Sequence, residues 1–254
     1  MYREYPILEY SDEAEGLLEP SRLIKRKDIP EFAVACFFQD VIAKLVAEHR
    51  AEEVARMQSE IGINPVYKLE WNGKALTVFH PGVGAPLAAA FLDEVIALGC
   101  TKFVACGGCG VLDSALVLGH IIVPDAAVRD EGTSYHYLPP AREVAASQED
   151  VQKVKAVLDR HGIRYTVGKT WTTDAIYRET SGKVAMRRGE GCLTVEMEAA
   201  AFFAVAQFRN VQMAQLLYGG DDLGGEAWDG RDWTRQTSVR EKLFWLAAEA
   251  CLDL

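Results

Sequence analysis

The stretch that decides the fold is LTVEMEAAAFFAVAQF, which runs from Leu193 to Phe208. Its opening residues, LTVEM, have the composition of a buried strand, and EAAAFFAVAQF has the composition of a buried helix. A strand that passes directly into a helix is the building unit of α/β proteins. Two carboxylates, Glu196 and Glu198, lie at this junction, and an ionised carboxylate in an apolar interior is costly unless it is paired. The junction is therefore the first place to look for function.

Strands and helices alternate along most of the chain. Strands are predicted at EFAVACFF (31–38), HIIVPDAAVRD (120–130), IRYTVGKTWTT (163–173) and VQMAQLLYGGDD (211–222), with a hairpin at 65–82 that turns at Asn72-Gly73. TKFVACGGCG (101–110) is predicted to be a short strand that runs into a glycine loop. Helices are predicted at 39–62, 85–100, 149–162, 198–209 and 238–254. This order predicts a single-domain α/β fold, a three-layer αβα sandwich around a mixed, largely parallel central sheet. We expect residues 1–30 to form an N-terminal arm and 31–254 to form one domain.

Composition narrows the function classes. The chain has 254 residues, 49% of them hydrophobic and 25% charged, which is enough for one large domain with a substantial core. The net charge of −10, with one short basic run at 22–28, argues against nucleic acid or an anionic membrane as partner. Neither a long apolar span nor a signal-peptide pattern is visible, so we expect a cytoplasmic protein whose scattered cysteines are reduced.

The glycine-rich stretch ACGGCG (105–110) follows a predicted strand and has two equally good interpretations. Glycines allow backbone N–H groups to approach an anion or a polar ligand, but they also suit a tight turn without any ligand. A redox function for Cys106 and Cys109 is weaker, because such motifs usually open a helix and Cys106 ends an apolar strand. Zinc needs four ligands, and no second pair at metal spacing exists. We expect no metal and no organic cofactor.

The acidic residues suggest how a sugar is bound. Glu196 and Glu198 are two residues apart, so on a strand both point to one face and into a pocket, whereas in the first turn of a helix both suit its dipole. A carboxylate pair can accept hydrogen bonds from a vicinal diol such as ribose. Asp221 and Asp222 end another strand, where a partly desolvated carboxylic acid can donate a proton to a leaving group. Alternatively, each of them is a solvated acid in a loop or the cap of a helix. Ligands of α/β sheets bind beyond the carboxyl ends of strands, so these segments are expected to converge.

The segment TVEMEAAAFFAVA (194–206) closely resembles the nucleoside phosphorylase family, which includes uridine phosphorylase, hexameric purine nucleoside phosphorylase and the methylthioadenosine nucleosidases. The resemblance extends from about Gly82 to Asp222, and VRDEGTSYHYLP (128–139) looks most like the uridine phosphorylase branch. It implies an enzyme that cleaves a nucleoside, by branch a pyrimidine nucleoside, into free base and ribose 1-phosphate. Inorganic phosphate would be the co-substrate. The resemblance also implies a homo-oligomer, either a dimer or a hexamer.

The resemblance implies roles for particular residues. Glu198 would bind the ribose hydroxyls, with Met197 packed against the sugar and Glu196 beside it. Asp221 would protonate or hydrogen-bond the departing base, so Glu198 and Asp221 would be the catalytic residues. The remaining implied binding residues are Gly108, Cys109 and Gly110 on the base and phosphate side, Thr172, Thr173 and Ile176 in the base pocket, and His136 near it.

The chain also departs from the family's pattern. The family's phosphorylases have one phosphate-binding arginine in a G-D-P-x-R segment and another just before the glycine stretch. Here the first region reads ACFFQDVIAK (35–44), and Ala105 occupies the second position. The loss of an arginine that binds phosphate through two hydrogen bonds is not a neutral change. Another arginine of this chain, Arg129, Arg178, Arg231 or Arg235, could compensate for it. A nucleoside hydrolase that uses water, and a nucleoside-binding protein without turnover, are therefore alternatives.

Overall fold

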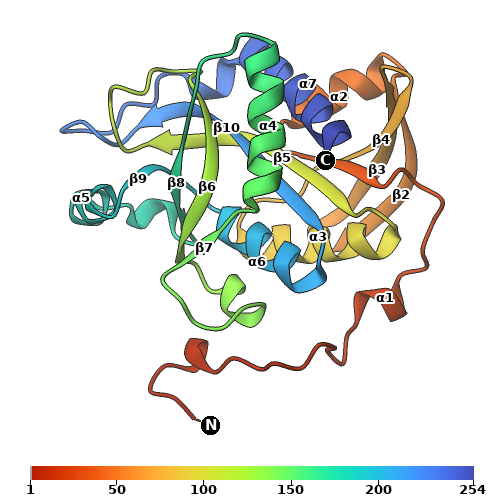
Figure 1. Cartoon of the computed structure of the whole chain (residues 1–254), viewed down its shortest axis with the longest axis horizontal. Coiled ribbons are helices and arrows are strands. Elements are labelled where there is room, and N and C mark those ends of the chain that lie inside the picture. The colour runs from red at the N-terminus through yellow and green to blue at the C-terminus, as the bar shows by residue number, and fades with distance from the viewer. Residues whose placement is uncertain (1) are drawn as a thin grey trace.

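The computed structural model describes residues 2–254 and contains one ten-stranded sheet covered by helices (Figure 1). The strands run in the order β10-β6-β8-β9-β5-β1-β4-β3-β2, and β7 pairs with β6. Their bounds are β1 (Phe32–Cys36), β2 (Ala51–Ser59), β3 (Gly62–Trp71), β4 (Lys74–Phe79), β5 (Lys102–Val111), β6 (Ile121–Asp130), β7 (Glu143–Ala145), β8 (Tyr165–Thr173), β9 (Cys192–Glu196) and β10 (Gln212–Asp222).

Strand β5 organises the sheet because it pairs with three other strands. It lies parallel to β1 and β10, and its last residues pair antiparallel with β9. Since β10 also pairs with β6, β6 with β8 and β8 with β9, these strands and β5 form a closed ring. The strands β1, β4, β3 and β2 extend from β5 as an open sheet. The predicted single-domain α/β fold with a mixed sheet is confirmed.

Helices cover both sides of this sheet. The longer ones are α2 (Gln39–Ala47), α3 (Ala85–Leu98), α4 (Gln148–Arg160), α5 (Ser181–Gly189), α6 (Ala199–Arg209) and α7 (Thr237–Asp253), and α1 (Pro20–Leu23) is a single turn. Helices α3 and α6 pack together, whereas α7 packs against β1, β5 and β10 with α2 and α4 beside it. Residues 199–206 of α6 are all buried, which explains why this helix is apolar on every side. Across residues 2–254 every helix is too short or too polar to cross a bilayer.

The predicted helix at 39–62 is wrong beyond Ala47. The chain leaves the helix through His49, which has a left-handed φ of 55°, and then forms β2, antiparallel to β3. Ala55 and Met57 of β2 are buried, while the residues that alternate with them are exposed. This period of two is typical of a strand with one covered face, and pairing with β3 decides the conformation.

The predicted glycine loop is also wrong, because the glycines belong to the second half of β5. The strand continues to Val111, so Gly107 and Gly110 have extended backbone inside a paired strand. A Cβ atom added to Gly107 would lie 3.0 Å from the ring of Phe37, and one added to Gly110 would lie 2.5 Å from a methyl group of Leu223. Glycine is needed here because neighbouring side chains approach the backbone closely, not because the chain turns.

The close packing around β5 predicts the effect of adding one methyl group. In Gly110→Ala the new Cβ would lie 2.5 Å from Leu223 Cδ1 and 3.0 Å from Val195 Cγ1, so we expect a loss of about 1–3 kcal/mol in the free energy of unfolding. Gly182→Ala is the matched control, because no atom lies within 4 Å of the added carbon and alanine favours the helix. Urea unfolding measures both, and equal stability of the two variants would contradict the packing described.

Candidate active site

A cavity of about 260 Å³ opens where β1, β5, β9 and β10 end. Its volume is close to the lower end of small-molecule sites, which range from about 300 to 1,000 Å³. The structure brings the three predicted strand ends together in its wall. The predicted site residues that line the cavity are Gly108, Cys109, Gly110, Ile176, Glu196, Met197, Glu198 and Asp221.

Glu196 lies at the end of β9 and caps the start of α6. Its Oε2 accepts the backbone N–H groups of Glu198, at 2.7 Å, and of Ala199, at 2.6 Å. Its Oε1 accepts the hydroxyl of Thr172 at 2.6 Å. The carboxylate therefore satisfies two of the N–H groups that a helix leaves free at its start. Glu196 ends β9 and lines the cavity, as the strand interpretation predicts. The placement in the first turn of the helix is wrong, although Glu196 stabilises the start of α6 from outside it.

Glu198 immediately precedes α6 and lies on the cavity wall. The N–H of Gly84 donates to its Oε1 at 2.6 Å. Burial raises the pKa of Glu198, and the nearby charge of Glu196 raises it further. Burial raises the pKa of Glu196 as well, against the hydrogen bonds that it accepts. Because Glu196 is already occupied by protein donors, the acceptor that remains for a ligand hydroxyl belongs to Glu198.

The two aspartates at the end of β10 have different surroundings. Asp222 is buried, where it accepts Arg231 Nη2 at 2.6 Å and the N–H of Gly224 at 2.7 Å. Asp221 lines the cavity, and its Oδ2 accepts the indole N–H of Trp228 at 2.7 Å. The buried ion pair makes Asp222 a structural residue, and Asp221 is the aspartate that a bound molecule can reach.

A fourth acid of the cavity wall, Glu179, was not found from the sequence. It follows the short turn η3 (Ile176–Arg178), lines the cavity and is partly buried. Burial and the charge of Asp221 raise its pKa to about 7. A carboxyl group that keeps its proton near neutral pH is suited to protonating a leaving group. No local motif marks Glu179, because its pKa depends on a residue of another strand.

Three predicted binding residues lie outside the cavity wall. Thr172 and Thr173 are buried in β8, where the hydroxyl of Thr172 supports Glu196 and that of Thr173 accepts a backbone N–H. His136 is exposed at the end of η2 (Thr133–His136), a turn that Tyr137 holds against α3. The cavity wall formed by residues 2–254 does not include them, so the roles of Thr172 and Thr173 in the base pocket and of His136 near it stay predictions.

The arginines that were considered as phosphate ligands lie outside the cavity wall. The cavity that residues 2–254 form is not lined by any of these four arginines, Arg129, Arg178, Arg231 and Arg235. The guanidinium of Arg129 donates to Ser134 and to two backbone carbonyls of its own loop. Arg240, which sequence reasoning did not single out, does line the cavity, and its Nη1 lies 2.9 Å from Asp40 Oδ1.

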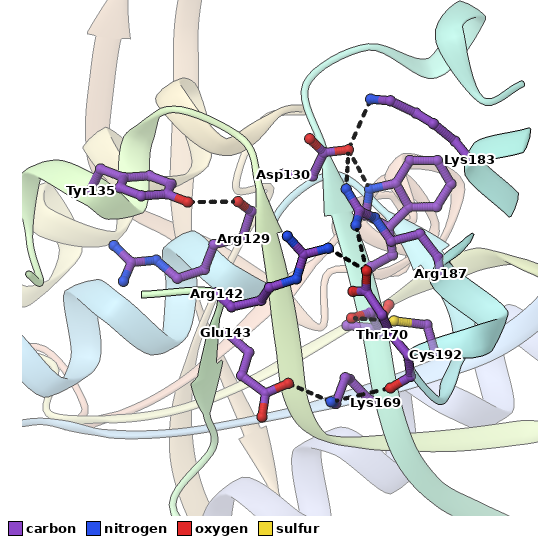
Figure 2. A network of polar contacts seen from close by, with 12 residues as sticks. Arg129, Asp130, Tyr135, Arg142, Glu143, Lys169, Thr170, Lys183, Arg187 and Cys192 are labelled. Atoms are coloured by element: carbon purple, nitrogen blue, oxygen red, sulfur yellow. Dashed lines mark hydrogen bonds and ion pairs between the residues drawn. The ribbon is translucent and has the colours of Figure 1, made fainter. Parts of the chain in front are cut away.

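A polar network holds the segment that follows η3 (Figure 2). Asp130 at the end of β6 accepts Lys183 Nζ and Arg187 Nη2 of α5, each at 3.0 Å. The indole of Trp171 also donates to Asp130, at 2.9 Å. Burial opposes the ionised form of Asp130, but the hydrogen bonds from Lys183 and Arg187 outweigh it and lower its pKa. The network fixes α5 against β6 and β8 and thereby limits where Glu179 can lie.

The cysteines of the C-x-x-C segment do not behave as redox groups. Cys106 and Cys109 are both buried, and burial raises the pKa of each thiol well above its ordinary value. A reactive thiol needs a lowered pKa and an accessible sulfur atom. Within residues 2–254 no three potential metal-ligating side chains gather at one point.

Comparison with known proteins identifies the family that this fold and cavity define. Residues 31–245 match the model of the Phosphorylase superfamily, and the chain belongs to this family. It is 26% identical over 220 residues to guanosine phosphorylase of Halorubrum lacusprofundi, which covers 83% of this chain and 89% of that protein. It is 28% identical over 156 residues to uridine phosphorylase of Thermococcus kodakarensis, and this match covers 58% of this chain and 56% of that protein. The solved structure of uridine phosphorylase from Vibrio fischeri shares the fold, with a TM-score of 0.76, 22% identity and coverage of 93% and 98% of the two chains.

The buried acid pair predicts that Glu198→Gln stabilises the protein at alkaline pH. The folded-state pKa values of Glu196 and Glu198 are raised, so the stability present when they hold protons is lost as the pH rises through those values. We expect the variant to gain roughly 1–3 kcal/mol at pH 9 and little at pH 5, since one pKa unit corresponds to about 1.4 kcal/mol. Calorimetry across this pH range, with the exposed Glu52→Gln as control, measures the difference, and a variant that is less stable at pH 9 would refute it.

Proposed function

We propose that this chain cleaves the N-glycosidic bond of a nucleoside. The observation that carries the proposal is that Glu198 and Asp221, which end different strands, line one cavity together with Met197. Membership of the Phosphorylase superfamily, whose matching relatives are named nucleoside phosphorylases, supports the same reaction class. The catalytic and binding roles given below are part of this proposal.

The sugar end of the cavity suits a positively charged transition state. Breaking an N-glycosidic bond develops positive charge on the ribose ring, and fixed negative groups lower the energy of that state. Glu198 accepts hydrogen bonds from the ribose hydroxyls, and Glu196, held by the start of α6, keeps Glu198 in place through the backbone. Met197 lies between them and packs against the sugar.

The base end of the cavity favours a purine over the pyrimidine that the sequence predicts. The pyrimidine expectation depends on the segment around His136, which lies outside the cavity wall. Glu179 and Asp221 are instead a pair of acids in which one carboxyl holds a proton near pH 7. A purine offers the ring nitrogen N7 as an acceptor for that proton, whereas a pyrimidine such as uracil offers only carbonyl oxygens, which are less basic. Ile176 supplies the apolar contact for the ring.

Two acceptors for the ribosyl group remain candidates. Phosphorolysis, which yields ribose 1-phosphate, agrees with the names of the relatives. Hydrolysis agrees with the scarcity of cations, because among residues 2–254 the cavity wall contains four acidic side chains and one arginine, Arg240. The Nη1 atom of Arg240 is paired with Asp40, and its Nε is buried without a partner. The homo-oligomer predicted from the family also belongs to this proposal, and Val83 and Ile176, apolar side chains of the cavity wall that are 64% and 54% exposed, support it.

The proposal predicts turnover that depends on two acids. Purified protein is incubated with inosine, guanosine, adenosine or uridine, with and without phosphate, and the released base and the sugar product are measured by chromatography. We expect Glu198→Ala and Asp221→Asn to lower kcat/KM by at least about 100-fold, which is the range for a lost acid or charge-stabilising group. Nucleoside binding without any base release would favour the binding-protein alternative. Full activity of both variants would end the proposal.

The raised pKa of Glu179 predicts the pH profile of that activity. If its carboxyl protonates the leaving base, kcat falls as the pH rises through about 7, because the proton is lost there. Glu179→Gln cannot titrate, so we expect a lower kcat, by about 10-fold or more, and loss of this limb of the profile. An unchanged limb in the variant would assign the titration to another group.

A further inference from the structure

The strongest unexplained feature of the cavity is the side chain of Gln215. It belongs to β10, is 1% exposed and lines the cavity. Neither its Oε1 nor its Nε2 has a hydrogen-bond partner within the protein. Burial of an amide without partners is unfavourable, and an apolar side chain of the same size would fill the place at a lower cost. An orphaned amide in the wall of a candidate active site therefore points to a ligand that completes its hydrogen bonds.

Gln215 lies in the cavity wall beside small residues of β5. In the sheet, Gln215 pairs with Ala105 of β5, and Ala105 pairs with Ala35 of β1. Paired residues of adjacent strands project from the same face, so the methyl group of Ala105 lies beside Gln215 and that of Ala35 lies one strand further away. The next row of the same face contains Leu217 and Gly107, and the ring of Phe37 lies close to Gly107. Gln215 thus reaches the cavity wall beside small residues of β5, with Leu217 and Phe37 as its larger neighbours in that wall.

The chemistry of an amide selects what can bind in this space. Its carbonyl accepts a hydrogen bond, its NH₂ group donates, and it carries no charge. Water both donates and accepts, so one water molecule can satisfy both ends of Gln215. Phosphate near neutral pH has mostly acceptor oxygens and a negative charge, and the four acidic side chains of the cavity wall repel it whenever they are ionised. The Nη1 atom of Arg240 is paired with Asp40 at 2.9 Å, and its Nε is buried without a partner.

We propose that Gln215 positions the attacking water and that the chain is a nucleoside hydrolase rather than a phosphorylase. The inference rests on the proposed cleavage of the N-glycosidic bond. The oxygen of water forms a bond to the anomeric carbon of ribose, the carbon–nitrogen bond breaks, and its electron pair leaves with the base. The water gives up one proton to a cavity carboxylate and the base gains one, so the products are free ribose and the neutral base.

The test replaces the amide with an apolar side chain of similar length. Gln215→Met is compared with wild type and with Gln58→Met, which makes the same change at an exposed position of β2. In phosphate-free buffer we expect wild type and Gln58→Met to release free ribose and base. We expect Gln215→Met to lose roughly 10- to 100-fold in kcat with little change in the KM for the nucleoside. Its melting temperature should stay the same or rise, because no internal hydrogen bond is removed.

Each outcome has a distinct meaning. Free ribose labelled from H₂¹⁸O, together with a loss of kcat in a fully folded Gln215→Met, supports the inference. Phosphate-dependent release of ribose 1-phosphate, or full activity of Gln215→Met, overturns it while the cleavage of nucleosides stands. A lower melting temperature of Gln215→Met with unchanged kcat would assign Gln215 a structural role and also overturns it. If wild type releases no base from any nucleoside in either buffer, the proposed function itself fails and the inference fails with it.

Discussion

The carboxylate of Glu196 at the start of α6 is the interaction on which the cavity depends. It accepts two backbone N–H groups of the helix and the hydroxyl of Thr172, so it joins β8, β9 and α6 at one point. With Glu196 occupied in this way, Glu198 is directed to the cavity wall, where Gly84 holds one of its oxygens. Two acids at an apolar junction are thus explained by different tasks. One builds the site, and the other is left free to meet a ligand.

The cost of this arrangement is electrostatic. Burial raises the pKa of Glu196, Glu198 and Glu179, so at alkaline pH the folded chain must hold charges that water would solvate better. Such strain is typical of functional sites and rare in a core that only packs. When these acids are ionised, they stabilise a cationic ribosyl transition state and repel an anionic co-substrate. The same acids therefore influence both the stability of the sugar's transition state and the choice of the nucleophile that attacks it.

Much of the fold could be predicted because it depends on local patterns. The strands, the Asn72-Gly73 hairpin and the closing helix follow from apolar periodicity and turn residues, and the predictions agree with β1, β3, β4 and α7. Prediction failed where pairing with another strand decides the conformation. Pairing with β3 makes a strand of β2, and pairing with three neighbours keeps the glycines of β5 extended.

The sequence by itself determined the α/β class, the family and the junction that carries Glu196 and Glu198, because these are encoded in a continuous stretch with its own period and composition. Only the tertiary structure decided that Asp221 and not Asp222 faces the cavity, that Thr172 supports an acid, and that His136 lies outside the wall. It also revealed Glu179 and Gln215. The raised pKa of Glu179 and the missing hydrogen-bond partners of Gln215 arise from burial and from residues of other segments, which a local stretch of sequence does not specify.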